Sequence, residues 1–200
     1  MLKMAYDKRH ITLRMAAIAL ATAASLTGPV DSRAQTAIYT NAAEWVTTTP
    51  NIGVEHALGS RYSVALDGML NPWDFSEGRR FHLWMARPEL RRWFCRPMDG
   101  HFLGVHLLGG QYNIRNIDLP MGLLPKTERG RHYEGWMIGA GLTYGYQWVL
   151  SRHWNAEAAI GLGYAYSPYK LYGRCDRVLR NDHRNYFGLT RLSLSMSYVF

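Results

Sequence analysis

Residues 133–167 contain the pattern that most limits the fold: two long stretches in which every second residue is bulky and apolar, joined by the short polar turn 151–153. A period of two places alternate side chains on opposite faces of a β-strand. The bulky face comprises Trp136, Ile138, Ala140, Leu142, Tyr144, Tyr146 and Trp148, followed after the turn by Trp154, Ala156, Ala158, Ile160, Leu162, Tyr164 and Tyr166. The two stretches therefore predict one long β-hairpin.

The aromatic residues of this hairpin gather at the two ends of its bulky face, and small aliphatic residues fill the middle. Membrane-spanning strands show this arrangement because Trp and Tyr side chains settle at the two headgroup levels. A tilted strand needs about 9–11 residues to cross the hydrocarbon, and both stretches are long enough. The other face is rich in glycine, which suits the crowded interior of a small closed barrel. The hairpin thus predicts an outer-membrane β-barrel.

The N-terminus has the composition of a secretory signal peptide. Basic residues precede an apolar run over residues 15–26, and Ser32-Arg33-Ala34 forms a small-x-small cleavage site before Gln35. We predict a signal peptide over residues 1–34 and a single barrel domain over residues 35–200. Residues 35–200 contain 18 basic and 13 acidic groups, which gives a net charge of +5. It contains no run of about 18 apolar residues, so a helical membrane protein is excluded.

Period-two patterns and turn residues divide the rest of the chain into an expected total of eight antiparallel strands in up-and-down order. The expected strands are 37–47, 51–58, one that begins at residue 62, 81–94, 101–114, the two of the hairpin, and a last one that ends at Phe200. The facing of 37–47 is ambiguous, and Pro88 predicts a bulge or an unpaired position. Short turns near residues 59, 97 and 152 alternate with expected long loops over 71–80, 115–132 and 168–185. This alternation predicts short turns in the periplasm and long loops outside.

The last strand alternates up to Phe200 and resembles the C-terminal strand that the barrel-assembly machinery reads in outer-membrane proteins. We therefore expect that machinery as a partner, together with outer-membrane lipid. In a soluble domain, an exposed Phe at a sheet edge would promote aggregation.

Charged residues fall on the face of the predicted strands that looks into the barrel. They are Glu55, Asp67, Arg87, Glu89, Arg91, His106, Glu157 and Arg191. Buried unpaired charges are costly, so we expect these groups to form a network of salt bridges across the lumen. Because a barrel of eight strands has room only for its own side chains, the network predicts a structural plug rather than a channel. A proton or ion path and a catalytic cluster are the alternatives.

An outer-membrane enzyme, such as a lipid A deacylase or a palmitoyl transferase, is the second hypothesis for function. It needs a nucleophile with a histidine base within hydrogen-bonding distance. The candidates are His132, His153 and His183 with nearby serines, but no spacing ties them together. We therefore predict no catalytic residue, no cofactor and no metal site.

The expected loop 168–185 carries a net charge of +3. Its cations are Lys170, Arg174, Arg177, Arg180 and Arg184. Cations on the outer surface can pair with lipopolysaccharide phosphates, for which arginine offers a bidentate fork. A solvated charged loop is the alternative. Nucleic acid is a poor partner for an exported barrel despite the basic composition.

The two cysteines, Cys95 and Cys175, would usually pair in an exported protein. The predicted topology places them at opposite ends of the barrel, beyond the roughly 7 Å between α-carbons that a disulfide tolerates. We therefore expect two free thiols.

Several stretches together resemble an outer-membrane family from Gram-negative anaerobes, the domain of unknown function 3575. They are TPNIGVE (49–55), NPW (71–73), RPELRRWF (87–94), GHFLGVH (100–106), GWMIGAGLTYGYQW (135–148) and NYFGLTRLSLSMSYVF (185–200). The resemblance covers nearly all of residues 35–200 and implies a barrel in the outer membrane. No catalytic residues are established for the family. Its frequent association with fimbrial or surface-structure genes implies a role in adhesion or assembly.

Overall fold

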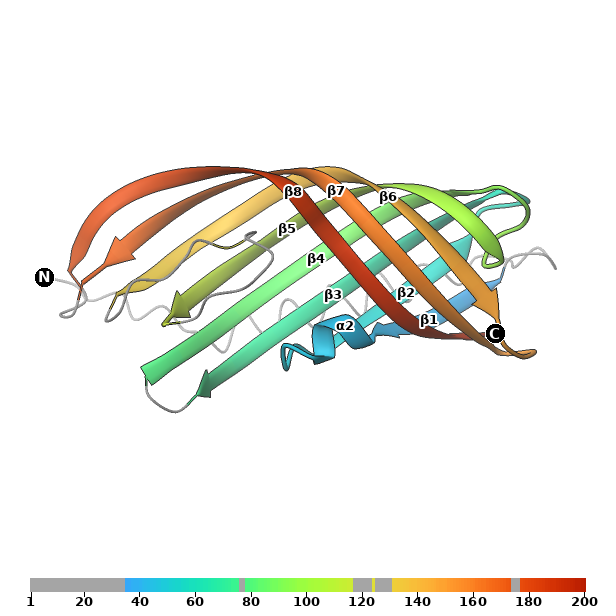
Figure 1. Ribbon diagram of the computed structural model, residues 1–200, viewed down its shortest axis with the longest axis horizontal. Helices are drawn as coiled ribbons and strands as arrows, with labels where there is room; N and C mark the ends of the chain where they lie inside the picture. Colours follow the sequence, from blue (N-terminus) through green and yellow to red (C-terminus); the bar gives the residue numbers. More distant parts are fainter. Residues whose placement is uncertain (1–34, 76–77, 117–123, 125–130, 174–176) are drawn as a thin grey trace, which may run out of the picture. The chain divides into compact units, whose positions relative to one another are not determined.

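The computed structural model describes residues 35–75, 78–116, 124, 131–173 and 177–200. The strands are β1 (Thr36–Asn41), β2 (Asn51–Ala57), β3 (Tyr62–Phe75), β4 (Arg79–Trp93), β5 (Gly100–Arg115), β6 (His132–Val149), β7 (Trp154–Tyr172) and β8 (Val178–Val199). Each strand pairs antiparallel with the next one in the chain, and β1 pairs with β8, so that the sheet closes on itself (Figure 1). The predicted all-β fold of eight antiparallel strands is confirmed. Among the described residues, no helix is long and apolar enough to cross a membrane.

The β6–β7 hairpin has the predicted sidedness. The side chains of Ile138, Leu142 and Leu162 point outward, and that of Leu142 is 66% exposed. The glycine-rich face points inward and is crowded, because a Cβ atom at Gly141 would lie 2.7 Å from the His106 ring. Glycine on this face therefore makes room for large side chains from other strands.

Outward-facing aromatic side chains contact one another near both ends of the sheet. At the end that carries the turns 58–61, 94–99 and 150–153, the Tyr198 ring lies 5.3 Å from that of Trp154 and 5.2 Å from that of Phe200. Nearer the other end, the Trp136 and Tyr166 rings are 6.1 Å apart. We call these two parts the turn half and the loop half of the barrel. Both chain ends of the sheet lie in the turn half, where the Phe200 amide donates to the Thr36 carbonyl.

The first predicted strand was wrong in its extent. β1 ends at Asn41, and residues Ala42–Trp45 form the short helix α2. The Asn41 side chain accepts a hydrogen bond from the Ala43 amide, as an N-cap does, and the sequence AAEW that follows has no period of two. The ambiguous facing of this strand is resolved, since Ala37, Tyr39 and Asn41 point inward.

Two of the three predicted long loops were also wrong. Residues 71–75 continue β3 and pair with the start of β4, and residues 168–172 continue β7 and pair with the start of β8. Polar composition led to the loop prediction, but hairpins that extend beyond an apolar band carry polar side chains on both faces. The expected loop 115–132 agrees with the end of β5 at Arg115 and the start of β6 at His132.

Pro88 interrupts one ladder without shifting it. It pairs with Leu66 on β3, whereas on the β5 side neither Arg87 nor Pro88 has a partner and the register is the same before and after. The predicted unpaired position is therefore confirmed. No bulge forms there, because proline only removes one N–H donor.

A bulge that the sequence pattern does not reveal lies in β8. Gly161 pairs with Arg191, but Leu162 pairs with Leu189, which leaves Thr190 as an extra residue. Thr190 and Arg191 are both buried although they are neighbours in the chain. Bulges change which residues face each side of a sheet, so inward positions in β8 are even-numbered before the bulge and odd-numbered after it.

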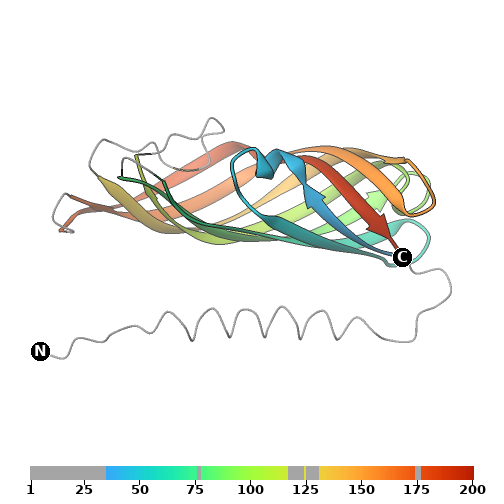
Figure 2. The same ribbon diagram turned by 90° about the horizontal axis from the view of Figure 1, so that it is seen from below.

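The barrel wall is unequal in height. β1 and β2 have six and seven residues, while the other strands have 14 to 22. Figure 2 shows β1 beside β8, with α2 at the end of β1. Among the described residues, strands therefore build the wall between β8 and β3 only in the turn half.

Candidate functional site: a charged cluster across the lumen

Arg91 of β4 is the centre of the charged cluster. Its side chain is fully buried, and its guanidinium lies within 2.9 Å of three carboxylates. Nη1 donates to Glu55 Oε2 at 2.8 Å and to Glu157 Oε2 at 2.7 Å, and Nε donates to Glu89 Oε2 at 2.9 Å. β4 thereby binds β2 and β7 across the lumen. A planar guanidinium with five N–H donors suits this role better than a lysine ammonium does.

A second group of ion pairs lies one layer nearer the loop half. Arg191 Nη1 of β8 donates to Asp67 Oδ1 of β3 at 2.9 Å and lies 3.3 Å from Glu89 Oε2. Arg87 Nη2 donates to Asp67 Oδ2 at 2.8 Å and to Glu44 Oε1 of α2 at 2.7 Å. Since Glu89 interacts with both Arg91 and Arg191, the two groups form one network.

His106 of β5 is buried beside this network and is held by hydroxyl groups instead of carboxylates. Its Nδ1 lies 2.8 Å from Thr143 Oγ1 of β6, and its Nε2 lies 2.9 Å from Thr190 Oγ1 at the β8 bulge. The bulge is what brings Thr190 and Arg191 into the lumen together.

The eight residues singled out in the sequence all lie inside the barrel with at most 7% exposure. Seven take part in ion pairs, and His106 takes part in hydrogen bonds. Sequence reasoning missed Glu44, because it was expected in a strand, and Tyr39, because the facing of that strand was ambiguous. Tyr39 donates from its hydroxyl to Asp67 Oδ1 at 3.3 Å. Asn41 at a helix N-cap was the one signal that could have located Glu44.

Aromatic rings complete the filling of the turn half. The Arg91 guanidinium lies 4.5 Å from the centre of the Phe102 ring, which is itself 4.8 Å from the Trp93 ring. Trp93 Nε1 donates to Ser63 Oγ, and Ser63 Oγ donates to Glu55 Oε1. All of these side chains are buried, so the cluster and its rings occupy the lumen from wall to wall.

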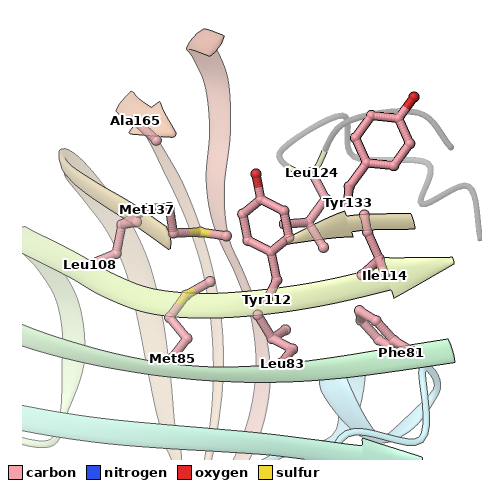
Figure 3. Packing of buried hydrophobic residues seen from close by; sticks show 10 residues of the cluster. All are labelled: Phe81, Leu83, Met85, Leu108, Tyr112, Ile114, Leu124, Tyr133, Met137 and Ala165. Carbon is pink, nitrogen blue, oxygen red and sulfur yellow. The ribbon is translucent and has the colours of Figure 1, made fainter. Parts of the chain in front are cut away.

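The loop half has a different interior. Its inward side chains form an apolar cluster of Phe81, Leu83, Met85, Leu108, Tyr112, Ile114, Leu124, Tyr133, Met137 and Ala165 (Figure 3). The change from charged or polar to apolar inward side chains is abrupt. Going toward the loop half, the next inward residue beyond Arg87 on β4 is Met85, and the next one beyond His106 on β5 is Leu108. Met69 of β3 and Tyr186 of β8 pack against the cluster and are only partly buried. The apolar character of this interior was not predicted from the sequence.

The three candidate catalytic histidines lie in separate places. His132 stacks on Tyr172 with ring centres 4.4 Å apart, His153 Nδ1 lies 3.0 Å from the Val199 carbonyl oxygen, and His183 packs near the Tyr166 ring. In the described ranges, no group of three or more His, Cys, Asp or Glu side chains is arranged to hold a metal ion.

Four of the five candidate loop cations can be placed, and Arg174 lies outside the described residues. Lys170 and Arg177 are exposed. Arg180 Nη2 lies 2.7 Å from Asp182 Oδ2, and Arg184 Nη1 donates to the Leu124 carbonyl at 2.9 Å. Cys95 is a free, exposed thiol near the 94–99 turn. Cys175 lies outside the described residues, so the expected separation of the two cysteines stays a prediction.

Comparison with known proteins gives a family and no individual relative. No curated protein matches the chain, and no solved structure matches it either. The family's sequence profile matches residues 15–200, which include all eight strands and every residue of the charged cluster. The chain therefore belongs to the family described as "Protein of unknown function (DUF3575)".

Proposed function

We propose that the protein is an integral β-barrel of the cell outer membrane, with a plugged lumen and a structural or surface-interaction role, and that it is not an enzyme. After a cleaved signal peptide, the barrel-assembly machinery would recognise the strand that ends in Phe200. The lipid and lipopolysaccharide of the outer membrane are its surroundings. An adhesion or fimbria-associated role would follow from the family resemblance.

The observation that carries the proposal is the apolar outer face of the closed sheet. Leu66, Leu90, Val105, Leu107, Ile138, Leu142, Ile160, Leu162 and Leu194 all point outward and are at least 48% exposed. Contiguous apolar surface rarely exceeds a few hundred Å² on a soluble monomer. Aromatic rings border this band at both ends, as they do at the two interfaces of a bilayer.

The plug is supported by the charged cluster. An open pore needs a polar lumen that water can fill, whereas Arg91, Trp93, Phe102 and Arg191 are each at most 2% exposed. Moving Arg91 aside would leave three carboxylates without their shared cation, which makes such an opening costly. We therefore expect no stepwise ion conductance through purified protein in planar bilayers.

The membrane proposal can be tested by fractionation of cells that express the full chain. We expect the protein in outer membranes after alkaline extraction, with a faster electrophoretic mobility before heating than after it. Leu142→Arg should reduce the folded fraction, because an arginine near the bilayer centre of a barrel costs about 2–4 kcal/mol. Arg152→Glu, in the exposed 150–153 turn, is the matched control and should change nothing. Recovery of the protein in the soluble fraction would contradict the proposal.

The absence of catalysis has a separate test. We expect the lipid A mass spectrum of a deletion strain to equal that of its parent. A new or missing acyl chain would instead support the lipid A-modifying enzyme.

A further inference from the structure

An arginine on the outward face of the turn half has no partner within the described part of the chain. Arg92 of β4 points outward and is exposed, and the outward residues on either side of it along the chain, Leu90 and Phe94, are apolar. No hydrogen bond or ion pair joins Arg92 to another described residue. A charge beside apolar surface is costly unless it is solvated or paired. The position therefore suits a ligand that brings a negative charge of its own.

Acidic side chains do not offset this charge from nearby. On the described strands of the turn half, every carboxylate points into the lumen. Asp99, in the turn that follows β4, is already paired with Arg96 at 2.8 Å. A second exposed arginine, Arg61, lies beside Arg92, because the next residue in the chain, Tyr62, is the cross-strand partner of Arg92. This part of the surface is therefore positive, and the described side chains leave it so.

Polar rings surround Arg92 on the same face of β3–β6, which follow one another around the wall (Figure 1). Tyr62 is its direct neighbour on β3, and His101 of β5 lies diagonally across, two residues before the other direct neighbour, Leu103. Long side chains at direct and diagonal positions of one face can reach one another. His101 Nδ1 lies 2.7 Å from the Tyr144 hydroxyl of β6. When that hydroxyl donates, Nε2 of the imidazole carries the proton and can donate to a further acceptor.

These side chains together offer several donors to one anion. We call Tyr62, Arg92, His101 and Tyr144 the cationic patch; all four are exposed, and none carries a negative charge. The Arg92 guanidinium is a planar fork that matches two oxygens of a phosphate at once. The imidazole and the phenol hydroxyls can donate to the remaining oxygens. The patch therefore fits an anion that has several oxygens.

The cationic patch borders apolar surface toward the middle of the wall. The next outward residues in that direction are Val64 of β3, Leu90 of β4 and Val105 of β5, and all three are exposed. Toward the turns, the Phe94 and Tyr146 rings lie 6.3 Å and 4.5 Å from the His101 ring. Aromatic rings of this kind settle at the headgroup level of a bilayer. A molecule with an anionic head and a hydrocarbon tail matches this order of surfaces, whereas a free anion would use only the patch.

We propose that the cationic patch binds the phosphate of an anionic glycerophospholipid in the leaflet on the turn side, with the acyl chains against Leu90 and Val105. The proposal rests on the membrane location proposed above. Charge complementarity selects this lipid, because the cationic group of a zwitterionic headgroup would lie among arginines. A lipid bound in this way would also fix the depth of the turn half in its leaflet.

Native mass spectrometry tests this inference on protein extracted from outer membranes of cells that express the full chain. The protein is released from detergent micelles that contain equal amounts of phosphatidylglycerol and phosphatidylcholine with identical acyl chains. We expect phosphatidylglycerol to be retained about two- to fivefold more often, the range that an exposed ion pair provides. The preference should shrink when salt is added before the release.

Two matched variants separate the cationic patch from general surface charge. Arg92→Gln should abolish the preference for phosphatidylglycerol, because the variant loses the guanidinium. Since Arg92 contacts no other described group, we expect this variant to fold as the unmodified protein does. Arg152→Gln removes the same charge from an exposed turn outside the patch and should keep the preference.

The possible failures are distinguishable. Equal retention of the two lipids by the unmodified protein overturns the patch as an anion site and leaves the membrane location intact. An equal loss of preference in Arg92→Gln and Arg152→Gln also overturns it, in favour of general attraction to a basic surface. Stronger retention of lipid A, added in the same amount, would assign the patch to the other leaflet and overturn the proposal. Recovery of soluble protein that retains no lipid would contradict the membrane location as well.

Discussion

The two halves of the barrel interior differ both in chemistry and in how the wall around them is closed. In the turn half, eight strands surround a charged network centred on Arg91. In the loop half, an apolar cluster lines a wall in which the part of the chain that the structure describes places no strand between β8 and β3. Charges pay a large desolvation penalty and therefore need a complete enclosure with every partner in place. Apolar side chains have no such requirement, because any hydrocarbon can cover them.

The complete part of the barrel therefore serves as a rigid base for the incomplete part. Ion pairs from β2, β3, β4, β7, β8 and α2 fix the positions of the strands in the turn half. Of these elements, β3, β4, β7 and β8 continue into the loop half, where their spacing no longer depends on β1 and β2.

The largest effect is expected from loss of the central cation in the turn half. Arg91→Met leaves Glu55, Glu89 and Glu157 without their shared partner and should lower the free energy of unfolding by about 3–5 kcal/mol. Urea unfolding in lipid vesicles, followed by tryptophan fluorescence, measures it. Arg92→Met is the matched control because Arg92 is exposed on the opposite face of β4. Equal unfolding midpoints for the two variants would contradict the idea that the charged network stabilises the fold.

Truncation in the two halves should have unequal costs. Phe102→Ala leaves a cavity in the closed turn half and should cost about 3–5 kcal/mol. Met137→Ala lies in the apolar cluster and should cost only about 2 kcal/mol, since the partly buried margin of the cluster at Met69 and Tyr186 lets neighbouring side chains relax into the space. The same vesicle unfolding experiment compares them. A Met137→Ala variant as unstable as Phe102→Ala would indicate that the loop half is as tightly closed as the turn half.

A smaller loss is expected at the boundary between the halves. Asn41 caps α2 and bonds the β8 edge at Leu192 and Leu194. Asn41→Ala should lower the free energy of unfolding by about 1–2 kcal/mol. Hydrogen exchange should also become faster at the Leu194 amide. Asn181→Ala, at an exposed position of β8, should do neither.

The smallest effect is expected at the exposed start of β8, away from the interior of either half. Arg180 is 70% exposed and pairs with Asp182 two residues away. Arg180→Ser should change the free energy of unfolding by less than about 1 kcal/mol, and the change should shrink further at high salt. A loss as large as that of Arg91→Met would mean that exposed and buried ion pairs contribute equally here.

Much of the turn half follows from the sequence. The period of two in β6 and β7 fixes which face looks inward, and the same rule places Glu55, Asp67, Glu89 and Arg91 in the lumen. Once four carboxylates and three guanidiniums share a small lumen, their pairing is a consequence of desolvation. Which carboxylate meets which guanidinium depends on the stagger between strands, and a sequence pattern does not specify it.

The loop half could not be predicted in the same way. The end of β1 at Asn41 depends on a local cap that competes with strand pairing, and the bulge at Thr190 leaves no mark in the alternation of apolar residues. The apolar cluster was missed because Met85, Leu108 and Met137 lie on the inward face, where the membrane pattern leads one to expect polar residues. The unequal height of the wall follows from differences in strand length, which become visible only when the pairing partners of each strand are known.

The shortness of β1 has a kinetic consequence. The ring is sealed only by residues 37–41 against 195–199, whereas every other junction except that of β1 with β2 is longer. A seam this brief yields little free energy until its neighbours are in place, so zipping of the first strand onto the last should be the final step of assembly. Strands β1 to β8 would then form an open sheet until Phe200 meets Thr36.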